Sequence, residues 1–175
     1  MLQPSTELQL PYLRTYATVV ASALGTAIPT LSVTAAALGG FYAQPIMVPL
    51  DYDRSRPGRL YCTIANGAGV GPAAGNVVLE GVLTHAPLAG FPTNNTVAQS
   101  HAVAAAWPAN SWEEVELGSE AAPFIPGGTL GLRSVLGIRL ARAGPAVGDT
   151  WAATLLLAQS LRLEYSRLCQ HCCCC

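Results

Sequence analysis

Apolar and polar residues alternate in short runs along most of the chain, as they do in β-strands that bury one face. The clearest run is Arg59 to Ile64, in which Leu60, Cys62 and Ile64 share one side. Similar runs predict further strands, although the alanines around Leu31 also permit a helical turn. The predicted strands span residues 16–20, 31–33, 59–64, 76–84, 97–106, 111–117, 136–140 and 150–165. Residues 1–14 are expected to form an irregular lead-in.

Turns rich in Gly and Pro separate the predicted strands, which follow one another about every 10 residues. This spacing favours an all-β fold, an antiparallel β-sandwich or jelly roll, over βαβ units. We expect three parts in the chain. They are an extended N-terminal arm or additional strands at residues 1–45, the jelly-roll β-sandwich at 46–168, and a Cys-rich C-terminal tail at 169–175.

The chain is poor in charged residues. They make up 11% of it, against roughly 25% in an average soluble domain, while hydrophobic residues make up 51%. So few charges imply an apolar surface, and such a surface usually marks contacts with other chains. The net charge is −1 and no basic run occurs, so nothing indicates nucleic-acid binding.

The longest uncharged stretch near the N-terminus runs from Thr15 to Leu50. A transmembrane helix needs about 20 apolar residues, but this stretch contains several Thr and Ser, Pro29 near its middle, and glycines. We therefore expect no membrane contact, and instead one or two strands or an extended arm buried against neighbouring subunits. The residues predicted to make these subunit contacts are Tyr16, Val19, Val20, Ile28 and Leu31.

The C-terminal tail concentrates cysteine, with five of the six cysteines in the last seven residues. One interpretation is disulfide cross-linking, because a tail with several thiols can reach neighbouring chains once a particle leaves a reducing cytosol. Another is zinc binding, but Cys62, His85 and His101 supply no second ligand pair, so two or three copies would have to complete the site. The third is a disordered tail without a function. The residues predicted to form cross-links are Cys169, Cys172, Cys173, Cys174 and Cys175.

Residues that could support catalysis are few. The three histidines are far apart in the sequence, and no nucleophile elbow, phosphate loop or dinucleotide motif occurs. Trp112, Glu114 and Glu116 share one strand face and could form a carbohydrate site with paired carboxylates. Charges that protect an exposed edge strand would give the same pattern. We therefore predict no enzymatic activity, no bound metal and no cofactor.

Several short motifs follow one another at defined spacings. They are Asp51-Tyr52-Asp53, Gly75-Asn76-Val77-Val78, Arg139-Leu140-Ala141-Arg142, Gly148-Asp149-Thr150 and Leu161-Arg162-Leu163-Glu164-Tyr165. In this order they resemble a β-sandwich domain common in bacteriophage structural proteins, over residues from about 45 to 168. The resemblance implies a jelly-roll protein that decorates capsids or forms fibres and spikes.

Two of these motifs also suggest local contacts. The acidic turn at Asp51 and Asp53 could bind a cation or accept hydrogen bonds from turn amides. Arg139 and Arg142 could pair with Glu164 or Asp149 across strands, and such pairs would give modest support at the surface.

Together these observations predict a bacteriophage capsid decoration or cement protein on the capsid exterior, assembled in the cytoplasm of the bacterial host. It would act as a homo-oligomer, expected to be a trimer, and would hold the major capsid protein or other virion proteins by burying apolar area worth about 25 cal/mol per Å². One alternative is a tail fibre, spike or receptor-binding module, with Trp107, Trp112 and Trp151 as contact aromatics unless they fill the core. The other is a small single-jelly-roll shell protein.

Overall fold

The chain is built from β-strands throughout the part that the structure describes. The computed structural model describes residues 5–17, 20–24, 28–35, 37–67, 74–87, 89–103, 107–109, 111–131, 133–144 and 146–168. Its strands are β1 (Ser5–Ala17), β2 (Val20–Leu24), β3 (Ile28–Val33), β4 (Leu38–Ala43), β5 (Ile46–Met47), β6 (Arg59–Asn66), β7 (Gly75–Ala86), β8 (Thr93–Val103), β9 (Trp112–Leu117), β10 (Val135–Ala143) and β11 (Leu155–Ser166). Within these ranges, no helix is long and apolar enough to cross a membrane.

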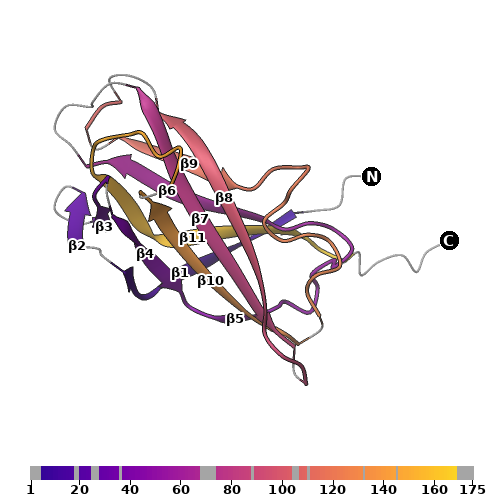
Figure 1. The fold of residues 1–175 in the computed structure, drawn as a ribbon. Helices are drawn as coiled ribbons and strands as arrows, with labels where there is room; N and C mark the ends of the chain where they lie inside the picture. The colour runs from indigo at the N-terminus through magenta and orange to yellow at the C-terminus, as the bar shows by residue number, and fades with distance from the viewer. Residues whose placement is uncertain are drawn as a thin grey trace.

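Eight of the strands pair in jelly-roll order, as if one long antiparallel hairpin were rolled up (Figure 1). The first pairs with the last (β3 with β11), the second with the seventh (β4 with β10), the third with the sixth (β6 with β9) and the fourth with the fifth (β7 with β8). Pairing of β11 with β6, and of β10 with β7, joins these ladders into two sheets. We name them the β11 sheet (β2, β3, β11, β6, β9) and the β10 sheet (β4, β5, β10, β7, β8). The predicted antiparallel jelly-roll sandwich is confirmed.

Strand β1 belongs to both sheets. Its first half, up to Pro11, pairs with β11, and its second half, from Tyr12, pairs with β4. The change of sheet lies at a proline, which cannot donate a ladder hydrogen bond and suits an irregular position. The irregular lead-in expected at residues 1–14 is therefore wrong, because residues 5–14 are strand. The break in alternation at Pro11 conceals this strand in the sequence.

The alternation in the sequence identifies the core. Leu60, Cys62 and Ile64 all lie in it, as predicted. On β11 the pairing with β6 shifts by two residues, since Leu157 lies opposite Ile64 but Leu161 lies opposite Cys62. A shift of two residues keeps side chains on their face, whereas a shift of one would reverse it. The five residues predicted for the inward face of β11 are all buried: Leu155, Leu157, Leu161, Leu163 and Tyr165.

The residues predicted for subunit contacts lie in different surroundings. Leu31 on β3 is 1% exposed in the core of this chain, so its side chain offers no surface to a second subunit. Tyr16 is partly buried on β1. Val20 and Ile28 belong to the β2–β3 hairpin, and Val19 lies outside the described residues. Within residues 1–45, β1 to β4 are strands of the sandwich itself.

One arginine points into the sandwich. Arg142 follows Leu136, Ile138 and Leu140 on the inward face of β10, and its side chain is fully buried. Its Nε and Nη2 donate two parallel hydrogen bonds, of 3.0 and 2.7 Å, to the carboxylate of Asp149 on the turn before β11. The predicted pairing with Asp149 is therefore correct, but its expected place at the surface is wrong.

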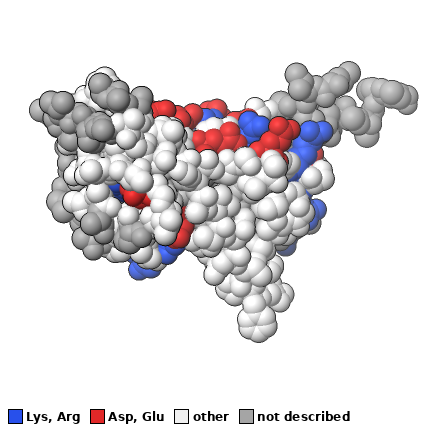
Figure 2. Space-filling view, turned by 45° about the horizontal axis from the view of Figure 1, so that its top comes forward, with Lys and Arg blue, Asp and Glu red and all other residues white. Residues whose placement is uncertain are grey.

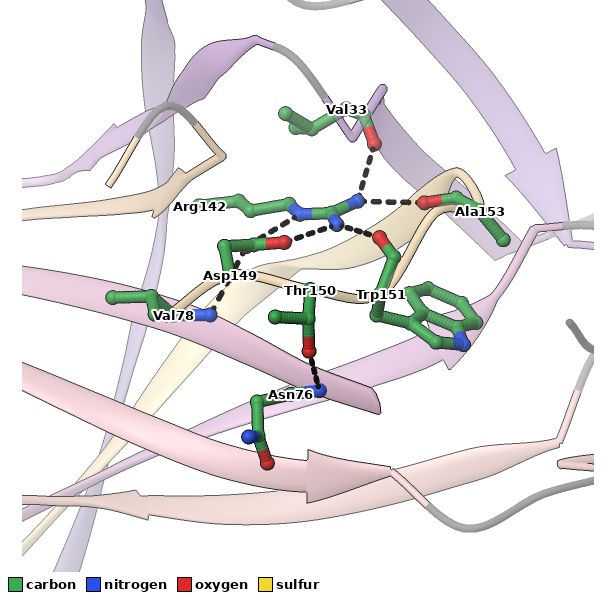
Figure 3. Close-up of polar contacts among 8 residues, drawn as sticks. All are labelled: Val33, Asn76, Val78, Arg142, Asp149, Thr150, Trp151 and Ala153. Atoms are coloured by element: carbon green, nitrogen blue, oxygen red, sulfur yellow. Dashed lines mark hydrogen bonds and ion pairs between the residues drawn. The ribbon is translucent and has the colours of Figure 1, made fainter. Parts of the chain in front are cut away.

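The remaining donors of Arg142 go to backbone carbonyl groups (Figure 3). Nη1 donates to Val33 and Ala153 at 3.5 and 2.6 Å, and Nη2 also donates to Trp151 at 2.5 Å. Asp149 in turn accepts a hydrogen bond of 3.1 Å from the amide of Val78 on β7. The cluster thus joins β3 of one sheet to β7 and β10 of the other.

We expect the substitution Asp149→Asn to lower the free energy of unfolding by about 3–5 kcal/mol, because it leaves the Arg142 guanidinium buried without a counter-charge. Urea denaturation followed by tryptophan fluorescence measures the change. The control is Glu116→Gln, which removes one partner of the partly exposed pair with Arg59 and should cost about 0–1 kcal/mol. Equal losses for the two variants would contradict a special role for the buried pair.

Candidate functional site

The outer face of the β11 sheet carries a ladder of paired charges centred on Arg162. Its Nη1 donates to Glu7 at 2.7 Å, and its Nε and Nη2 donate to Glu114 at 2.9 and 2.6 Å. The guanidinium also lies 3.9 Å from the ring centroid of Tyr61. The hydrogen bonds to Glu114 raise the pKa of Arg162 further above its ordinary value. Figure 2 shows acidic and basic side chains side by side in a band across the molecule.

The possible carbohydrate site at Trp112, Glu114 and Glu116 lies in this ladder. Glu114 accepts two parallel hydrogen bonds from Nε and Nη2 of Arg162, and Glu116 lies 3.6 Å from Nε of Arg59. Each carboxylate is thus already paired with an arginine of another strand in the same sheet. We therefore favour the alternative interpretation of the sequence, in which these acids protect an exposed edge strand from pairing with other chains.

The outer face of the β10 sheet carries a different cluster, which we name the Arg–Tyr row: Arg14, Tyr16, Tyr42 and Arg139. Arg14 lies 4.8 Å from the ring centroid of Tyr42, and Arg139 lies 4.2 Å from that of Tyr16. The two rings meet edge to face with their centroids 5.6 Å apart. Arg139 also forms an ion pair with Glu80 on β7, and not with Glu164 as considered from the sequence.

A pocket of about 300 Å³ opens beside the Arg–Tyr row. Three members of the row line it, Arg14, Tyr42 and Arg139, and Gly137 also belongs to the lining. The absence of a side chain at Gly137 leaves space, since the nearest atom to a Cβ built there would be the carbonyl oxygen of Thr84 at 3.9 Å. The other lining residues are Leu13, Ala43, Pro45, Val82, Thr84 and Ile138.

The register of the strands brings the residues of the Arg–Tyr row together, and no sequence motif contains them. Arg14 on β1 lies opposite Tyr42 on β4, and Tyr42 lies opposite Arg139 on β10. These residues are far apart in the sequence, so they cannot be grouped until the pairing is known. The one signal available beforehand was the alternation on β10, which predicts that Arg139 lies on the face opposite Leu136, Ile138 and Leu140.

The three tryptophans do not form an exposed aromatic patch. Trp107 and Trp151 are 8% and 1% exposed, and their ring centroids lie 5.5 Å apart in the core. Trp112 is partly buried on β9. The alternative that tryptophans fill the core is therefore correct for Trp107 and Trp151.

The acidic turn at Asp51 and Asp53 makes contacts within the chain. Asp53 accepts hydrogen bonds from the hydroxyl and amide of Ser55 at 2.6 and 3.1 Å, and the hydroxyl bond lowers the pKa of Asp53. Asp51 accepts a hydrogen bond of 2.5 Å from Arg167. Burial raises the pKa of Tyr52 to about 12. The turn interpretation therefore fits, and the described residues contain no group of three or more His, Cys, Asp or Glu side chains that could hold a metal ion.

The cysteines fall into two classes. Cys62 is fully buried between the sheets, and burial raises its thiol pKa to about 12. It is therefore a core side chain in its unreactive thiol form at neutral pH. The predicted cross-linking residues Cys169, Cys172, Cys173, Cys174 and Cys175 lie outside the described part of the chain, so their role stays a prediction.

Comparison with known proteins identifies no family, since neither a protein-family model nor a curated protein sequence matches the chain. Among solved structures, the carbohydrate-binding module TmCBM61, in complex with β-1,4-galactotriose, is similar at 10% identity and a TM-score of 0.36, over 86% of each chain. A family 30 carbohydrate-binding module matches at 13% identity and a TM-score of 0.39, over 90% of this chain and 98% of the other. A chain of infectious bursal disease virus matches at 13% identity and a TM-score of 0.35, over 95% of this chain and 37% of the other. None of these similarities bears on function.

We expect iodoacetamide to leave Cys62 unmodified in the folded protein, because the thiolate is the reactive form and burial suppresses it at Cys62. Peptide mass spectrometry after brief labelling at pH 8, with and without 8 M urea, measures the difference. Cys62 should be labelled only in urea. Labelling of Cys62 at the same rate in both conditions would contradict its burial.

Proposed function

We propose that the chain is a non-enzymatic structural protein of a bacteriophage particle, of the capsid decoration or cement type, which acts as a homo-oligomer on the capsid exterior. The observation that carries the proposal is the separation of charge over the surface. The outer face of the β11 sheet holds the ladder around Arg162, whereas the region of β8 and the end of the β10 sheet expose uncharged side chains. A charged face suits solvent, and an uncharged one suits contact with other chains.

Strand β8 is the first part of the uncharged surface. It is 11 residues long, and among the described residues it pairs with β7 alone. No Asp, Glu, Lys or Arg occurs between Glu80 and Glu113, and the strand contains no proline; its one ionisable side chain is His101, which lies 3.2 Å from Glu113. A long edge with these properties is a template for pairing with another strand, and monomeric proteins normally protect such edges with charges, prolines or bulges. We infer that a second copy covers it in the oligomer.

The second part is an apolar end of the β10 sheet, which we define by Leu13, Met47, Phe91 and Val135. All four side chains are exposed, and Phe91 is 91% exposed in the loop between β7 and β8. Val135 lies opposite Met47 on one side and opposite Ala86, the last residue of β7, on the other. Figure 2 shows an uncharged projection where this end of the β7–β8 hairpin lies in Figure 1. Exposed side chains of this kind are suited to burial against the capsid shell.

In this proposal the uncharged side faces the major capsid protein or other virion proteins, and the charge ladder faces water. Interfaces of specific complexes bury about 1,200–2,000 Å² in total, and the free chain exposes 9300 Å². One such contact per neighbour would therefore use a modest part of its surface. The predicted trimer belongs to the same proposal, because it gives the symmetry of these contacts. The predicted disulfide bonds of the tail would link neighbouring chains covalently.

A receptor-binding module of a tail fibre or spike is the second candidate. The observation that favours it is the pocket beside the Arg–Tyr row, because a small-molecule site is of no use to a purely mechanical clamp. The two candidates differ in abundance, since decoration proteins cover a shell and receptor-binding modules occur at the few positions of a tail.

Copy number in purified particles of the phage that encodes the chain tests the proposal. Quantitative mass spectrometry with isotope-labelled peptides, normalised to the major capsid protein, should give hundreds of copies per particle. A few copies per particle would move the assignment to the tail, and absence from the particles would refute a virion role.

The substitution Ala98→Lys tests the role of the β8 edge in self-association. Ala98 is exposed in the middle of the strand, so the change should leave the fold intact and weaken the oligomer at least tenfold by placing a charge on the contact. Light scattering coupled to gel filtration over a concentration series measures it. The control is Gln9→Lys, the same added charge on the exposed outer face of the β11 sheet. If both variants associate like the unmodified chain, the β8 edge is not the contact.

A further inference from the structure

We propose that the pocket beside the Arg–Tyr row binds a sugar acid, that is, a sugar ring that carries a carboxylate group. The first reason is the charge balance. Arg14 and Arg139 both line the pocket, but Arg14 forms no ion pair with any described carboxylate, and Glu80 balances only Arg139. Two guanidinium groups thus face one acid, which leaves a net positive charge for an anionic ligand to meet.

The second reason is the way in which the two arginines are held. Each lies over a tyrosine ring, within 4.8 Å of its centroid, and contacts of this kind fix the plane of a guanidinium group. Arg139 donates to Glu80 through Nη2, and its Nη1 makes no hydrogen bond to any described residue. The planar fork of arginine matches a carboxylate with two parallel hydrogen bonds. Donors that are already oriented lose less entropy when a ligand binds.

The third reason is the size and lining of the pocket. A volume of about 300 Å³ lies at the lower end of the range of ligand pockets, about 300–1,000 Å³, and suits a ligand of one or two rings. Leu13, Pro45 and Val82 form apolar walls for the C–H faces of a sugar ring. The hydroxyl of Thr84, which donates to Asn94 at 2.8 Å, can still accept a hydrogen bond from a sugar hydroxyl group.

This inference rests on the second candidate function, a receptor-binding module, because in a capsid decoration protein the outer face of the β10 sheet would lie against the shell. A single site of this size binds weakly, but many copies on one particle would bind a repetitive acidic polysaccharide with much higher avidity. The pocket can bind its ligand whether or not the chain belongs to a capsid, so its test is independent of the copy number in particles.

Titration of the isotope-labelled protein, followed by two-dimensional NMR, tests the ligand class. Sodium glucuronate is the probe, and glucose and sodium acetate represent the ring and the anion alone. We expect glucuronate to bind with a Kd on the order of 1 mM, with shifts confined to residues around the pocket, and glucose and acetate to bind at least tenfold more weakly. Equal binding of acetate would refute the sugar part of the proposal, and no shift with 20 mM glucuronate would refute the site.

Two variants locate the binding. Arg14→Gln removes the unpaired charge, and Gly137→Val fills the pocket from a strand position that has room for a Cβ. Each should weaken glucuronate binding at least tenfold, while the NMR spectrum elsewhere stays that of the unmodified chain. The control is Arg59→Gln, which removes an arginine from the opposite sheet and should leave the affinity unchanged. Unchanged affinity in both pocket variants would overturn the assignment.

Discussion

The ion pair of Arg142 and Asp149 holds together the end of the sandwich from which the last strand starts. Removing two charges from water costs several kcal/mol per ion unless every donor and acceptor is satisfied. Here the five N–H groups of Arg142 meet five acceptors, two carboxylate oxygens and three backbone carbonyl oxygens. Since those carbonyls belong to β3 and to the segment before β11, the pair fixes where β11 enters its sheet. The register of this central strand with β1, β3 and β6 therefore depends on it.

The two outer faces of the sandwich differ in the charged side chains that they carry. Arg162 gathers acidic residues of three strands on the β11 sheet into a compact, solvated network. On the β10 sheet, arginines pack on tyrosines beside a pocket, and the edge strand β8 contains no Asp, Glu, Lys or Arg. A molecule with so uneven a surface is suited to an assembly, in which one side meets protein and the other side meets water.

The sequence predicts the fold class because burial of one strand face imposes a period of two, and this period is visible on β6, β7, β10 and β11. It fails at β1, where a proline at the change of sheet interrupts the alternation. It also misplaces Arg142, because a charged residue at an inward position looks like the end of a strand until its partners are known. The candidate site is hidden for a related reason. Arg14, Tyr42 and Arg139 meet only through the register of three strands, and register is a property of the whole sheet.

Electron cryomicroscopy of the particle tests the proposal that the chain is a structural protein on the exterior of a phage capsid. We expect jelly-roll density at repeated positions on the outside of the shell, with the β8 edge against a second copy and the β11 sheet toward solvent. Density for this fold at the tail tip alone, or at no position of the particle, would contradict it.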